Sequence, residues 1–110
     1  MNAPLIDAHK EAAELAKRGQ EWADADGVAR LLEETKSTLL AQIASEHAKE
    51  SAAKADLLAK ADERYAVHIK GMVEARTRAN KAKVKFDTYK AYVEMLRTNA
   101  STDRAMMQMR

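Results

Sequence analysis

The sequence contains no cysteine, a single proline and only three glycines among its 110 residues. Without cysteine, disulfide bonds, thiolate metal sites and thiol chemistry are all excluded. The scarcity of proline and glycine removes the two residues that most often interrupt helices. Because Ala, Lys, Glu, Arg, Leu and Met dominate the remainder, we expect an all-α protein that forms one helical domain over residues 1–110.

Aromatic residues are also few, with five in the whole chain. An apolar set this poor in bulky side chains and rich in alanine makes a thin compact core. We therefore expect long helix–helix seams to stabilise the fold, and we expect a homo-oligomer to complete those seams.

Long apolar runs are missing as well. No window approaches the roughly 18 consecutive apolar residues of a membrane span, and the first residues lack the basic start and apolar run of a signal peptide. The absence of cysteine fits a reducing compartment. We expect a cytoplasmic protein with no membrane partner.

Charge is unevenly distributed along the chain, although the formal net charge is only +2. Residues 1–69 hold 9 Lys/Arg and 13 Asp/Glu, a net charge of −4, while residues 70–110 hold 10 and 4, a net charge of +6. Such asymmetry indicates either a polyanionic partner for the C-terminal part or internal pairing between an acidic helix and a basic one.

The N-terminal half predicts two helices. Pro4 near the first turn and Gly19 at the end bound a short amphipathic helix over residues 4–18. A polar stretch then predicts a break, after which an aspartate caps a second helix over residues 24–49. Trp22 lies in this break, and we expect it to pin the first helix to the rest of the fold, with an exposed protein-binding anchor as the alternative.

The C-terminal half predicts a short connector and one long helix. Ser51 is a good N-cap for a helical connector over residues 51–60, and Asp62 is a good cap for a helix over residues 62–98. A methionine-rich tail, residues 99–110, follows. The expected architecture is a short N-terminal helix followed by a long antiparallel, coiled-coil-like helical hairpin.

The long helix carries an almost uninterrupted heptad repeat. Every seventh residue from Tyr65 and from His68 falls on one face, and only His68 among them is polar. At 1.5 Å per residue the helix is about 55 Å long, which is more than the second helix can cover. We therefore expect the larger apolar members to form a core and oligomer seam: Tyr65, Met72, Phe86, Tyr89, Val93 and Leu96.

A basic segment, RTRANKAKVKF at residues 76–86, flanks this repeat. One interpretation is that its cations face acidic side chains of the second helix, which favours antiparallel packing between the two. The other is that one edge stays open and binds the phosphates of single- or double-stranded DNA in a sequence-independent, salt-sensitive manner. The nucleic-acid-binding candidates are Arg76, Lys83, Lys90 and Arg97.

No constellation of catalytic or metal-ligating residues accompanies these features. His9, His47 and His68 lie in three separate segments without a second ligand at a metal-binding spacing, and the glycines form no phosphate-binding loop. We expect no catalytic residue, no metal and no cofactor. The sequence favours a non-enzymatic protein that acts by binding.

Residues 51–107 are similar to a group of small helical proteins encoded by bacteriophages and prophages, often alongside DNA recombination or single-strand annealing functions. The likeness lies in the order of signals: Asp62 and Tyr65 at a helix start, then residues 96–98 (Leu-Arg-Thr), then residues 104–106 (Arg-Ala-Met). The resemblance implies a viral accessory protein in the bacterial host cytoplasm and assigns no activity to particular residues.

Three functions follow as hypotheses. The first is nucleic-acid binding in DNA recombination or replication through the basic helix. The alternative is a protein-binding inhibitor of a host enzyme or defence complex, which would use the overhanging helix or the methionine-rich tail as its contact surface. The third is a purely structural coiled-coil oligomer.

Overall fold

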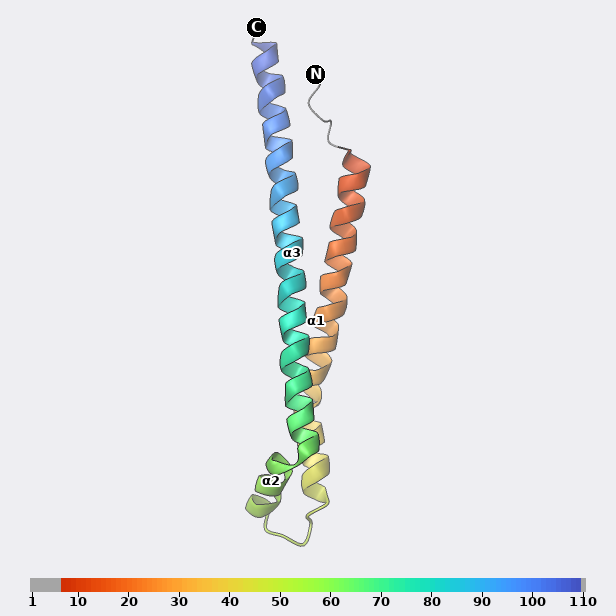
Figure 1. The fold of residues 1–110 in the computed structure, drawn as a ribbon, viewed down its shortest axis with the longest axis vertical. Coiled ribbons are helices and arrows are strands. Elements are labelled where there is room, and N and C mark those ends of the chain that lie inside the picture. The colour runs from red at the N-terminus through yellow and green to blue at the C-terminus, as the bar shows by residue number, and fades with distance from the viewer. Residues whose placement is uncertain (1–6, 110) are drawn as a thin grey trace. The chain divides into compact units, whose positions relative to one another are not determined.

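The computed structural model describes residues 7–109, which form three helices and no strand (Figure 1). They are α1, Ala8–Ser45; α2, Ala52–Ala61; and α3, Glu63–Gln108. Helix α1 packs against α3, and contacts such as Leu32 with His68 and Asp26 with Arg76 show that the two run antiparallel. The all-α class and the antiparallel helical hairpin are confirmed, whereas the oligomer stays a prediction.

Contacts divide the chain into two compact units. The terminal unit comprises Met1–Trp22 and Lys81–Arg110, and the central unit is Ala23–Asn80. Helices α1 and α3 contribute to both units, and α2 belongs to the central one. Within residues 7–109, no helix has the combined length and apolar character that a membrane span requires.

Helix α1 is continuous where the sequence predicted a break between residues 18 and 24, so that prediction is wrong. Each glycine inside a helix costs about 1 kcal/mol relative to alanine, and the good helix formers on both sides offset this. At Gly19 the missing side chain also has a use, because a Cβ there would lie 3.2 Å from Cε1 of Phe86. Residues 4–6 of the predicted first helix lie outside the described part.

A heptad repeat of its own runs through α1. Counting in alternate steps of three and four from Glu11 to Ile43 selects residues that are all buried or half-buried. Polar side chains at several of these positions, and Gly19 beside them, conceal the repeat in the sequence. The series consists of Glu11, Leu15, Arg18, Trp22, Ala25, Ala29, Leu32, Lys36, Leu39 and Ile43.

Caps define the ends of α2 and the start of α3. The Ser51 hydroxyl oxygen accepts a hydrogen bond from the backbone N–H of Lys54 at 3.2 Å, as expected of an N-cap. An Asp62 carboxylate oxygen accepts the backbone N–H of Arg64 at 2.8 Å, at the start of α3. Helix α3 then continues to Gln108, past the end predicted at residue 98, because residues 99–108 contain neither proline nor glycine.

Small side chains form the core of the central unit. Ala29 of α1 packs with Ala75 and Ala79 of α3, and all three are buried. Ala25 and Leu32 flank this cluster. Alanine at the contact lets two helices approach closely, so the buried area here comes from backbone proximity more than from bulky side chains.

Aromatic rings replace alanine in the terminal unit. Trp22 of α1 stacks on Phe86 of α3 with ring centroids 5.8 Å apart, and Val93 is almost completely buried. Gly19 lies beside the Phe86 ring. Trp22 thus attaches the N-terminal part of α1 to α3, in line with the pinning role expected of it.

We predict opposite effects for the same substitution at two glycines of α1. Gly19→Leu would force a side chain into the space of Phe86 and lower the free energy of unfolding by about 1–3 kcal/mol. Gly27→Leu is the matched control: a Cβ there meets no packing neighbour within 4 Å, so better helix propensity raises that free energy by about 0.5–1 kcal/mol. Urea denaturation measures both, and equal effects would contradict the packing at Gly19.

Candidate interaction surface

The predicted seam of α3 serves the core of the chain itself. In the terminal unit Val93 is buried and Phe86, Tyr89 and Leu96 are half-buried. In the central unit Tyr65 and Met72 are half-buried. These side chains therefore pack within one chain, and their role as an oligomer seam stays a prediction.

Tyr89 is fixed by two residues of α1. Its hydroxyl donates a hydrogen bond to the Glu11 carboxylate, and the Arg18 guanidinium lies 4.5 Å from the centroid of its ring. The hydrogen bond to Glu11, together with burial, raises the pKa of Tyr89 to about 12. A ring held in this way is part of the core and does not offer a free face on which a nucleotide base can stack.

Arg76 is engaged in an internal ion-pair network. Its Nη2 lies 2.6 Å from Oε1 of Glu33, and its Nη1 lies 2.8 Å from Oδ1 of Asp26. Hydrogen bonding to Arg76 is the main cause that holds the pKa of both carboxyl groups below their usual values. Arg76 thus faces acidic residues of α1, as the internal-pairing interpretation expects, and its role in nucleic-acid binding stays a prediction.

Lys83 is also close to a side chain of α1. Its Nζ lies 5.6 Å from the centroid of the Trp22 ring, within range of a cation–π interaction. The ammonium group is exposed, so this contact does not exclude a further partner. It does place Lys83 over the aromatic core of the terminal unit.

Lys90 and Arg97 are exposed, and within residues 7–109 neither has an ion-pair partner. Asp87 and Glu94 alternate with them on the same side of α3 at helical spacing. Alternating signs are typical of a solvated helix face, whereas a phosphate-binding edge favours cations alone. The structure thus leaves two of the four predicted cations unengaged, on an edge of mixed charge.

A second, uncharged face of α3 includes part of the methionine-rich tail, which the sequence already suggested as a contact surface, and extends from there back to Tyr92. It comprises six exposed residues in alternate steps of three and four, and we call it the C-terminal stripe. Three of its members are methionines with 52% to 87% of their surface exposed. The last turns of α3, which carry part of the stripe, extend past the start of α1 (Figure 1). The stripe consists of Tyr92, Met95, Asn99, Thr102, Met106 and Met109.

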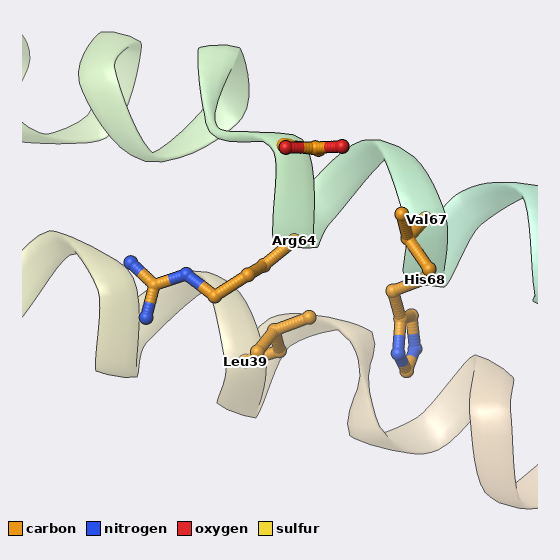
Figure 2. Close-up of a pocket in the computed structure, with 5 residues that line it drawn as sticks. Leu39, Arg64, Val67 and His68 are labelled. Carbon is orange, nitrogen blue, oxygen red and sulfur yellow. The ribbon is translucent and has the colours of Figure 1, made fainter.

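An open hollow of about 400 Å³ lies in the central unit, between Leu39 of α1 and the first turns of α3 (Figure 2). Two of its polar side chains, His68 and Arg64, are engaged. His68 Nε2 donates to the Leu32 carbonyl at 2.7 Å, and Arg64 pairs with Glu46 and Asp62, which lowers the pKa of Asp62 to about 2. Glu63, the first residue of α3, also lines the hollow, and its carboxylate has no ion-pair partner within residues 7–109.

Metal-ligating side chains do not gather elsewhere in the described part of the chain. Within residues 7–109, no group of three or more His, Cys, Asp or Glu residues is placed to hold a metal ion.

Comparisons with known proteins identify no relative. No family model, no curated protein and no solved structure matches the chain. The resemblance of residues 51–107 to small phage and prophage proteins accordingly stays a prediction, and function has to be inferred from the surface itself.

We predict that Arg76→Gln lowers the urea midpoint of unfolding at neutral pH, while Lys90→Gln, at an exposed unpaired cation, leaves it unchanged. Asp26 and Glu33 have lowered pKa values in the fold, so their stabilising contribution is present above their ordinary pKa values of 3.8 and 4.5 and is lost as pH falls below them. The difference in urea midpoint between the native chain and Arg76→Gln should therefore become smaller as the pH falls from neutral to acidic. A difference in urea midpoint that does not change with pH would contradict the ion-pair network.

Proposed function

We propose that the chain is a non-enzymatic protein that acts by binding a protein helix through the C-terminal stripe of α3. The observation that carries this proposal is the exposure of Met95, Met106 and Met109 on one uncharged face of a helix. Fully burying a methionine side chain contributes about 1.5–3 kcal/mol. About half of that remains available to a partner at Met95 and Met106, and more of it at Met109. The flexible thioether side chains suit packing against another helix.

The spacing of the stripe also favours a helical partner. Residues in alternate steps of three and four line one side of an α-helix, and this is the pattern by which helices pack in coiled coils or dock in grooves. Scattered exposed apolar residues are normal on protein surfaces, but their alignment in one row supports an interaction site. The proposal therefore favours the protein-binding hypotheses over a catalytic role.

Nucleic-acid binding in recombination or replication is the second candidate. It rests on Lys90 and Arg97, which are exposed and have no ion-pair partner within residues 7–109. It has less support than helix binding because Arg76 is paired and because Asp87 and Glu94 interrupt the remaining edge.

Photo-crosslinking in the native host tests the proposal. A photoreactive amino acid at Met95 or Met106 should yield covalent adducts with protein, whereas the same group at Lys90 or Arg97, on the other side of α3, should yield none. All four positions are exposed, so accessibility is matched. Absence of adducts from the stripe, or equal adducts from both sides, would contradict helix binding at the stripe.

The nucleic-acid candidate has its own measurement. Binding of single- and double-stranded DNA to the purified chain is measured across a salt series, with Lys90→Gln/Arg97→Gln as the variant. Binding that weakens with salt and is lost in the variant would favour the nucleic-acid function. We expect no such binding.

A further inference from the structure

The C-terminal stripe is complementary to itself when two copies run in opposite directions. We propose that a second copy of this chain binds the stripe, so that two α3 helices pack antiparallel to form a homodimer. The inference rests on the proposed function of the stripe as a helix-binding surface, and it names the partner.

The stripe has the geometry of a coiled-coil seam. Its six residues span 92–109 in alternate steps of three and four, over about 26 Å of helix. This seam is separate from the one that α3 forms with α1, since the stripe residues are exposed while Phe86 and Val93 are covered. One helix thus carries two seams on different faces.

When two stripes pair antiparallel about their midpoint, three kinds of residue pair face each other across the interface, and each pair forms one layer. Tyr92 lies opposite Met109, which joins an aromatic ring to a thioether. Met95 lies opposite Met106. Asn99 lies opposite Thr102, where the amide N–H of Asn99 donates to the Thr102 hydroxyl oxygen. Two-fold symmetry repeats each layer, as an isologous interface requires, and the polar layer sets the register.

Charge does not oppose this pairing. Within residues 92–109, the residues that flank the stripe include one charged side chain, Asp103, and are otherwise Leu96, Thr98 and Ala105. Like charges are thus not brought together along the antiparallel interface. A partner that binds a charged edge needs side chains of opposite charge. A second copy of the uncharged stripe needs none.

Charge does oppose the parallel arrangement. Continuing the same three–four spacing toward the N-terminus of α3 reaches Thr88, Lys85 and Lys81. A parallel pair in register would place Lys85 and Lys81 against their own copies. An antiparallel pair centred on the stripe leaves both lysines outside the overlap, so repulsion selects the antiparallel orientation.

Engineered disulfides test the dimer and its orientation. The chain has no cysteine, so the variants Met95→Cys and Met106→Cys each carry one thiol. Mixed and oxidised, the two variants should form a disulfide-linked dimer in at least several-fold higher yield than either variant alone. A mixture of Lys90→Cys with Met106→Cys is the control, since residue 90 lies on another side of α3, and it should give no such increase.

Sedimentation equilibrium of the purified native chain supplies an independent measurement. The mass should approach twice that of one chain as concentration rises, and Met95→Glu/Met106→Glu should abolish this rise while circular dichroism stays helical, because both positions are exposed. A monomer at all concentrations, or higher yields from the single cysteine variants than from their mixture, would overturn the inference. If the photoreactive group at position 95 still formed adducts with a different protein, the proposed function would stand without the homodimer. If it formed no adduct at all, both the proposed function and the homodimer would be contradicted.

Discussion

Close packing of α1 against α3 through small side chains is the interaction on which the rest of the structure depends. Ala29, Ala75 and Ala79 bury little surface individually, but they let the two backbones approach, and the approach fixes the register of the central unit. That register brings Arg76 between two carboxylates of α1. An apolar seam thus attracts the helices, and flanking charges select the alignment.

The proposed function rests on what this packing leaves uncovered. The seam positions of α3 pack within the chain, and Arg76 is paired with Asp26 and Glu33 of α1. The exposed surface of the terminal unit, within residues 7–109, includes an edge of mixed charge and the uncharged C-terminal stripe. A row of exposed methionines at helical spacing is costly to leave in water, and contact with another helix removes that cost.

Local patterns in the sequence were sufficient for the helical class, the hairpin and the heptad repeat of α3, because 3.6-residue periodicity is a property of the chain alone. The continuity of α1 was not predictable in the same way. Gly19 resembles a helix stop until Phe86, distant in the sequence, is found against it. The pairing of Arg76 likewise depends on register between helices. The stripe could have been predicted, since its three–four spacing continues past residue 98. It was missed because the helix was expected to end there.

Native-state hydrogen exchange tests the central claim most directly. At low protein concentration, the amides of Ala29, Ala75 and Ala79 should share one free energy of opening, equal to that of global unfolding, because α1 and α3 stabilise each other. The amides of residues 101–109, where α3 is fully exposed, should exchange orders of magnitude faster. If amides in α3 were protected while those around Ala29 exchanged rapidly, α3 would be folded without α1. That result would contradict the claim that the two helices stabilise each other.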